Sequence, residues 1–160
     1  MDRNELEKIR IQKMENMRTA GMEPYPTRAN PSHTIGEAIR AFEQSEGAAA
    51  SSGDAGSPIQ ATLAGRLRSS RPMGKLIFAH IEDGSGRIQL FIRVNEAGEE
   101  SMQLFRENFD LGDFVEASGT LVRTRTGEIS LQVSGLRMLA KAITPLPAAK
   151  DEVIDGQVVR

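Results

Sequence analysis

The sequence has no cysteine and only two histidines among its 160 residues. Without cysteine, the chain cannot build a disulfide framework, a cysteine-ligated zinc site, an iron–sulfur cluster or a thiol nucleophile. With His33 and His80 as the only imidazoles, a histidine-rich catalytic metal centre is excluded as well.

Long apolar stretches are also missing. No apolar run reaches the roughly 18 residues that suggest a membrane-spanning helix. The N-terminal sequence MDRNELEKIR is charged and lacks the apolar core of a signal peptide. We therefore expect no membrane contact and a cytoplasmic, reducing environment.

The composition is that of a folded protein. Hydrophobic residues make up 39% of the chain and charged residues 26%, with 15 glycines in addition. These fractions are typical of globular domains and exclude wholesale disorder. The length suits one compact domain with an appendage.

The N-terminal part, residues 1–43, is predicted to be a helical extension. Apolar residues recur at helical spacing over 2–20, and Gly21 ends the pattern. A second, short helix begins at Thr34, which forms a capping-box pair with Glu37. The small and polar residues 44–58 predict a flexible linker.

From Ile59 onward the apolar period changes to two. Three half-buried strands are predicted, over 59–68, 77–82 and 87–93, and the last two form a hairpin. A helical pattern covers 98–109, and two more strands follow around 115–121 and 129–133. The predicted class is mainly β (α+β): a five-stranded Greek-key OB-fold barrel over 59–143, with a helix between strands 3 and 4. A five-stranded sandwich is the alternative.

The predicted hairpin has an unusual outer face. Alternation places six apolar residues inward: Ile77, Ala79, Ile81, Ile88, Leu90 and Ile92. The opposite face then carries Phe78, His80, Arg87, Gln89, Phe91 and Arg93. Aromatic rings, an amide and cations on one face suit single-stranded nucleic acid, whose bases stack and whose phosphates need positive charge.

Each of these residues has a simpler interpretation. An outward phenylalanine often packs under a helix, and for Phe91 we favour packing, with the N-terminal helix available as a cover. For Phe78 we favour binding. His80 is expected to be a hydrogen-bonded neighbour, and Arg87 and Arg93 are possible solvated charges.

Charge is unevenly distributed despite a net value of −2. Residues 60–93, including Arg66, hold six basic against two acidic side chains, and residues 120–141 hold four against one. Residues 94–119 hold one basic against seven acidic. This pattern predicts a polyanion-binding surface on the strands and an acidic region around the connecting helix.

Several segments carry a family resemblance: GRLRSSRPMGKLIFAHIEDGSGRIQLFIR, FDLGDFVEASGTLVRTRTGEISLQV and KAITPLP. Together they closely resemble the N-terminal anticodon-binding domain of class II lysyl-tRNA synthetases, and the MEPYP segment matches the start of that family. The resemblance covers nearly the whole chain except 44–58 and about the last dozen residues. Aspartyl- and asparaginyl-tRNA synthetases share the fold but fit less well.

The resemblance implies specific roles in binding the anticodon loop of lysine tRNA. The central uridine would stack on Phe78 and be contacted by Gln89 and Arg71. Glu128, in the turn between the last two strands, would read a neighbouring base. The strand face adds further candidates for RNA contacts: Arg66, His80 and Arg87.

The resemblance also implies that the chemistry lies elsewhere. ATP and magnesium would bind a catalytic domain that follows this region in the family, and residues 144–160 would begin the connection to it. We expect no cofactor in this chain, no lysyl-adenylate formation by it alone, and a homodimer for the full-length protein. Two other functions stay open: a free-standing OB-fold binder of single-stranded nucleic acid, and an interaction domain using helix 98–109 and the N-terminal helix.

Overall fold

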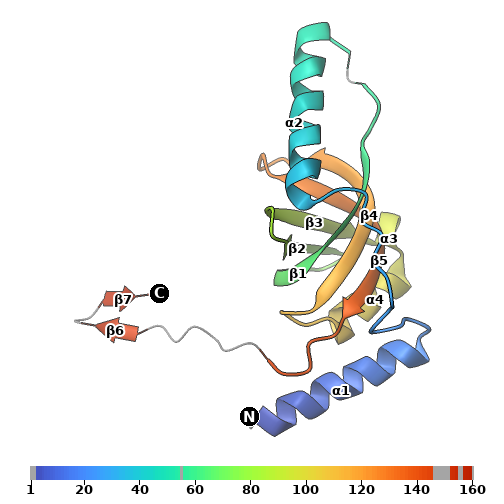
Figure 1. Ribbon diagram of the computed structural model, residues 1–160, viewed down its shortest axis with the longest axis vertical. Coiled ribbons are helices and arrows are strands. Elements are labelled where there is room, and N and C mark those ends of the chain that lie inside the picture. Colours follow the sequence, from blue (N-terminus) through green and yellow to red (C-terminus); the bar gives the residue numbers. More distant parts are fainter. Residues whose placement is uncertain (1–2, 55, 146–151, 155–156, 160) are drawn as a thin grey trace.

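The computed structural model describes residues 3–54 and 56–145, together with the backbone of 152–154 and 157–159. Most strands form one closed barrel (Figure 1). The barrel strands are β1 (Gln60–Met73), β2 (Leu76–Glu82), β3 (Arg87–Arg93), β4 (Phe114–Arg123) and β5 (Ile129–Ala140). The helices are α1 (Arg3–Thr19), α2 (Ile35–Ser52), α3 (Val94–Ala97) and α4 (Glu99–Asn108). A separate two-stranded sheet pairs β6 (Glu152–Ile154) with β7 (Gln157–Val159).

The strand order around the barrel is β1-β2-β3-β5-β4, and β4 pairs with β1 to close the ring. The β3–β5 pairing is parallel, while the other pairings are antiparallel. Helices α3 and α4 connect β3 to β4. This is the predicted OB-fold connectivity, and the closed ring distinguishes it from an open sandwich.

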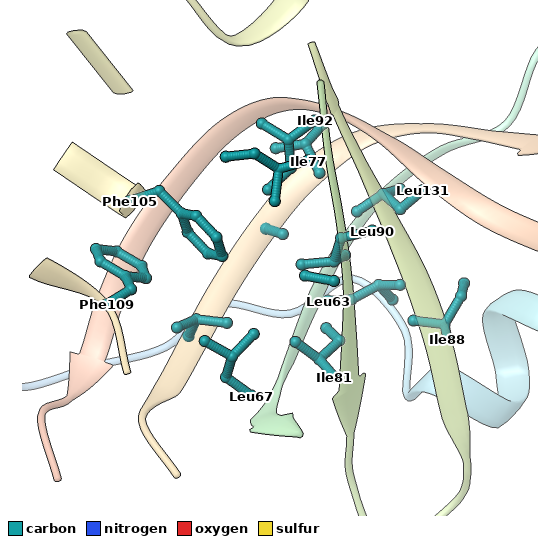
Figure 2. Packing of buried hydrophobic residues seen from close by; sticks show 14 of the residues in the cluster. Leu63, Leu67, Ile77, Ile81, Ile88, Leu90, Ile92, Phe105, Phe109 and Leu131 are labelled. Atoms are coloured by element: carbon teal, nitrogen blue, oxygen red, sulfur yellow. The ribbon is translucent and has the colours of Figure 1, made fainter. Parts of the chain in front are cut away.

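The barrel interior is filled by the residues that the alternation placed inward. All six apolar residues predicted for the interior of the β2–β3 hairpin are buried, together with Leu63 and Leu67 from β1 (Figure 2). Helix α4 covers one end of this core with Phe105, whose ring lies 5.0 Å from that of Phe109. Each large apolar side chain buried here contributes about 1.5–3 kcal/mol of transfer free energy.

Helix α1 packs against α4 at the end of the barrel shown lowest in Figure 1. Met17 is fully buried in this contact, whereas Ile9 and Ile11 stay exposed. Next to it, the buried Lys141 ammonium binds the carboxylates of Asp110 and Asp113 at 2.8 Å each. The apolar residues predicted at helical spacing over 2–20 therefore form a packing face over only part of helix α1.

Helix α2 confirms one prediction and corrects another. The Thr34 hydroxyl accepts from the Glu37 amide, and the Glu37 carboxylate accepts from the Thr34 amide, so the capping box is formed. The helix continues to Ser52, however, so residues 44–52 are helical and the prediction of a flexible linker was wrong for them. Alanines favour this extension, and Gly53 ends it in the left-handed region at φ 72°.

One glycine is required by the closeness of two strands. At Gly119 a Cβ atom would lie 1.9 Å from the backbone oxygen of Gln132, well inside any permitted contact. The β4–β5 register shifts between Ser118 and Gly119, which marks an irregularity where the strands approach. A side chain at this position would force β4 and β5 apart.

Most of the predicted connection at 144–160 lies outside the described residues. No helix in the described part of the chain is long and apolar enough to cross a membrane.

Candidate nucleic-acid interface

A hollow of about 560 Å³ lies on the outer face of the barrel. We call it the β1–β3 hollow, because three neighbouring strands form its floor and the β4–β5 turn forms one wall. It is lined by Ser69, Arg71, Met73, Phe78, His80, Arg87, Gln89, Thr126 and Glu128. The structure thus brings together every predicted site residue except Arg66.

The position of Arg71 depends on an irregularity in β1. Leu67 pairs with Ile81, but Ser69 pairs with His80, so Arg68 is an extra residue in the strand. This bulge moves the odd-numbered residues that follow it to the outer face. Arg71 therefore lies directly opposite Phe78 across the β1–β2 pair.

Phe78 offers a half-buried ring at the edge of the hollow. It packs against Phe91 of β3, with ring centroids 5.2 Å apart and planes inclined at 34°. The guanidinium of Arg93 lies 5.1 Å from the centroid of the Phe91 ring. Because Phe91 packs beside it, the Phe78 ring is held in place and can present a face to an incoming base.

The structure corrects two expectations about this pair. Helix α1 does not cover Phe91, because α1 packs against α4 instead. Arg93 is not simply solvated, because its Nε donates to a Glu96 carboxylate oxygen at 3.0 Å. Phe91 packs as expected, but against Phe78 rather than under a helix.

Gln89 is more enclosed than an outer strand residue usually is. It is only 9% exposed, because β5 lies beside β3 and Ser130 pairs with it. The Ser130 hydroxyl donates to the Gln89 amide oxygen at 2.9 Å. The amide nitrogen has no acceptor among the described residues, so it can donate to a carbonyl oxygen of a bound base.

His80 links the floor of the hollow to its wall. Its Nε2 lies 2.8 Å from a carboxylate oxygen of Glu128, and its Nδ1 lies 2.8 Å from the Ser69 hydroxyl. An ionised carboxylate only accepts hydrogen bonds, so Nε2–H donates to Glu128. This confirms His80 as a hydrogen-bonded neighbour and leaves the second Glu128 oxygen for a ligand.

The cations of the hollow are not engaged elsewhere. Arg71 and Arg87 are exposed, and neither side chain makes a hydrogen bond or ion pair within the described part of the chain. Guanidinium groups in this state can contact phosphates or base edges without first breaking an internal bond.

Arg66 does not join the others. Its guanidinium lies 4.7 Å from the centroid of the Phe114 ring. Arg66 pairs with Glu82 and lies five positions before Arg71 in β1. Arg66 lies on the outer side of β1, as the alternation predicted, but too far along the strand from Arg71 to line the β1–β3 hollow, so its RNA contact stays a prediction. Its buried Nε has no hydrogen-bond partner in the described structure.

Sequence reasoning missed the residues that orient the site. Ser130 and Ser69 are ordinary strand residues in the sequence, and their contacts with Gln89 and His80 depend on strand register. The alternation of β5 could have suggested an outward Ser130, but not its partner.

Within the described residues, no group of three or more acidic or histidine side chains could hold a metal ion.

A five-stranded closed barrel with an aromatic and cationic hollow over strands β1–β3 defines an OB-fold nucleic-acid-binding domain. Residues 61–139 match the tRNA anticodon family model, described as an OB-fold nucleic acid binding domain. This region of the chain belongs to the anticodon-binding OB-fold family.

The chain is also similar to particular ligases. It is 47% identical over 148 residues to a lysine–tRNA ligase of Roseiflexus castenholzii and 44% identical over 148 residues to one of Chloroflexus aurantiacus. Both alignments cover 92% of this chain and 28% of the relative. A lysine–tRNA ligase of Pelotomaculum thermopropionicum is 38% identical over 146 residues, covering 91% of the chain.

These comparisons confirm the resemblance to the N-terminal anticodon-binding domain of lysine–tRNA ligases. The chain spans little more than a quarter of the length of the curated relatives it matches. The matched region is an OB-fold nucleic-acid-binding domain of the anticodon-binding type.

Proposed function

We propose that this chain binds the anticodon loop of lysine tRNA and recognises its central uridine. Within a lysine–tRNA ligase, this contact orients the tRNA for aminoacylation. The supporting observation is the convergence of the Phe78 ring, the unpartnered Gln89 amide nitrogen and the free Arg71 guanidinium in the β1–β3 hollow.

The chemistry of these groups fits uracil. A base can stack on Phe78, while its carbonyl oxygens accept hydrogen bonds from the Gln89 amide or from Arg71. The Glu128 carboxylate oxygen that His80 leaves free accepts from an amino or imino group, so it suits a neighbouring base. Arg87 supplies charge for a phosphate at the other side of the hollow.

The test is binding of the 160-residue chain to anticodon stem-loops. We expect the lysine stem-loop to bind more tightly than one in which cytidine replaces the central uridine. The expected difference is about 1–3 kcal/mol, the usual cost of mismatched base-edge hydrogen bonds. Equal affinity for the two stem-loops at the same salt concentration would reject the proposal.

The properties of the whole ligase are further proposals. ATP and magnesium would act in its catalytic domain, and the full-length protein would be a cytoplasmic homodimer. The 38–47% identity to lysine–tRNA ligases supports this assignment. Lysine-dependent ATP–pyrophosphate exchange by the protein that carries this domain tests it.

A further inference from the structure

The β4–β5 turn carries two residues of the hollow, Thr126 and Glu128. The turn is closed by its own backbone: the Gly127 amide donates to the Thr124 oxygen at 2.9 Å, and the Thr124 amide donates to the Glu128 oxygen at 3.0 Å. Gly127 has φ +88°, a conformation that favours glycine. A short exposed turn of this kind needs outside support if it is to hold a base-reading side chain in one place.

One support comes from helix α2. The Arg123 guanidinium donates from Nε to the Glu46 carboxylate at 2.8 Å, and Nη2 bonds the second oxygen of the same carboxylate. Its remaining nitrogen, Nη1, donates to the Gly127 oxygen at 2.6 Å. One planar side chain therefore joins α2 to the turn, where Figure 1 shows the β4–β5 hairpin passing beside the helix.

The electrostatics of the pair agree with this geometry. The hydrogen bond from Arg123 lowers the pKa of the Glu46 carboxyl, and the same bond raises the pKa of the Arg123 guanidinium. The guanidinium also lies 5.9 Å from the centroid of the Phe42 ring on α2. Both partners are charged at neutral pH, and the two-point contact restricts the orientation of the Arg123 guanidinium.

The second support comes from the opposite side. His80 of β2 holds one oxygen of Glu128 at 2.8 Å. The turn is thus fixed at Gly127 by the helix and at Glu128 by the strand. A base-reading carboxylate must be held to within about 0.5 Å to discriminate between donors, so both contacts bear on specificity.

We propose that Glu46 and Arg123 are positioning residues that clamp the β4–β5 turn, so that Glu128 discriminates the anticodon base next to the central uridine. This inference rests on the proposed function, because it assigns the clamp to the same anticodon site. Glu46, in the part of α2 beyond Glu43, then has a role in recognition, although it does not line the β1–β3 hollow.

The experiment compares three single variants. Glu46→Gln removes the negative charge and one of the two carboxylate oxygens that the Arg123 guanidinium binds. Arg123→Lys keeps the positive charge but loses the planar guanidinium. Glu43→Gln is the matched control, because Glu43 lies one turn earlier on α2 and attracts Arg123 without a hydrogen bond to it. Each variant is measured by amide hydrogen exchange and by binding to stem-loops that differ at the central or the neighbouring base.

We expect faster exchange of the Thr124 and Gly127 amides in Glu46→Gln and Arg123→Lys. We also expect discrimination at the neighbouring base to fall about two- to fivefold, as suits an exposed ion pair. Discrimination at the central uridine stays at the wild-type level, because Phe78 and Gln89 do not depend on the clamp. The double variant should lose no more than Arg123→Lys alone, because that substitution already disrupts the guanidinium that joins Glu46 to Gly127.

Two results would overturn the inference. One is wild-type exchange and discrimination in Glu46→Gln; the other is an equal effect in Glu43→Gln, which would mean that only charge matters. Failure of the proposed function looks different, because the wild-type chain itself would then show no preference at the central base. Faster exchange in that case would leave the clamp as a structural contact and reject its role in recognition.

Discussion

Phe78 packs against Phe91 across the β2–β3 pair, with ring centroids 5.2 Å apart. Phe78 lines the β1–β3 hollow, whereas Phe91 lies beside it, close to Arg93, and outside that hollow. The two phenylalanines are alike in the sequence, but their positions give them different expected roles.

We expect Phe78→Ala to weaken binding of an anticodon stem-loop by about 1–3 kcal/mol, because it removes a stacking surface. The loss should depend little on which base replaces the central uridine, since every base can stack. Phe91→Ala should instead lower the melting temperature more than the affinity. Affinity titrations and melting curves of both variants test this, with the distant Phe114→Ala as control. A folded Phe78→Ala chain with wild-type affinity would make Phe78 a packing residue only.

Gln89 should determine the choice of base rather than the strength of stacking. Gln89→Ala should cost about 1–3 kcal/mol with uridine at the centre and less once that base is changed. Ser130→Ala should reduce the preference for uridine in the same direction but by about 0.5–1.5 kcal/mol, because it frees the Gln89 amide to rotate. The measurement is binding to stem-loops differing at one base. Loss of affinity without loss of preference would argue against this orientation of the amide.

Arg87 should contribute to the salt dependence of binding. Because the proposed function assigns it to a phosphate, Arg87→Gln should lower the slope of log affinity against log salt by about 0.7, the value for one contact on single-stranded nucleic acid. Lys8→Gln, on the exposed side of α1, is the control for a lost charge far from the hollow. Titrations at several salt concentrations give the slopes. An unchanged slope with weaker binding would contradict a phosphate contact by Arg87.

Asp110 should make the fold sensitive to acid. Burial raises its pKa, but hydrogen bonds from Lys13 and Lys141 outweigh burial and hold the pKa below its ordinary value. A carboxylate whose folded pKa is lowered stabilises the fold fully above its unfolded pKa of about 3.9, and this contribution is lost as the pH falls through the folded pKa.

Asp110→Asn should therefore lower stability at pH 7 by about 1–3 kcal/mol and flatten the decline of stability below about pH 4. Urea unfolding over a pH series provides the measurement. Glu99→Gln, on the exposed start of α4, is the control and should follow the wild-type profile. If the free energy of unfolding falls equally steeply below pH 4 in wild type and Asp110→Asn, Asp110 does not cause the sensitivity to acid.

Gly119→Ala should destabilise the barrel by about 3 kcal/mol or more, because the added methyl group meets the Gln132 oxygen and neither backbone can move without breaking β4–β5 pairing. Gly47→Ala is the contrasting substitution. Nothing lies within 4 Å of a Cβ there, and Gly47 is inside helix α2, so alanine should stabilise by up to about 1 kcal/mol. Thermal or urea unfolding of both variants decides; equal effects would contradict the close approach of β4 and β5.

The sequence alone was sufficient for the barrel class and for half of the site. Period-two alternation in the β2–β3 hairpin requires one buried face, so it determined that Ile77 and Leu90 lie inside and that Phe78 and Gln89 lie outside. The Thr34–Glu37 spacing determined the start of α2, because a capping box forms between residues that are close in the sequence. Arg71 and Glu128 came from the family resemblance, because neither has a local signal that separates it from a solvated charge.

Tertiary structure decided where the local pattern is interrupted and what the outward residues contact. The extra residue Arg68 reverses the faces of β1, so the odd-numbered Arg71 faces outward into the hollow, and no alternation rule predicts a bulge. The attachment of the β4–β5 turn to α2 depends on a contact between Glu46 and Arg123, which are 77 positions apart in the chain. The burial of Gln89 depends on the parallel β3–β5 pairing. These features arise from long-range strand and helix packing, which period and propensity do not encode.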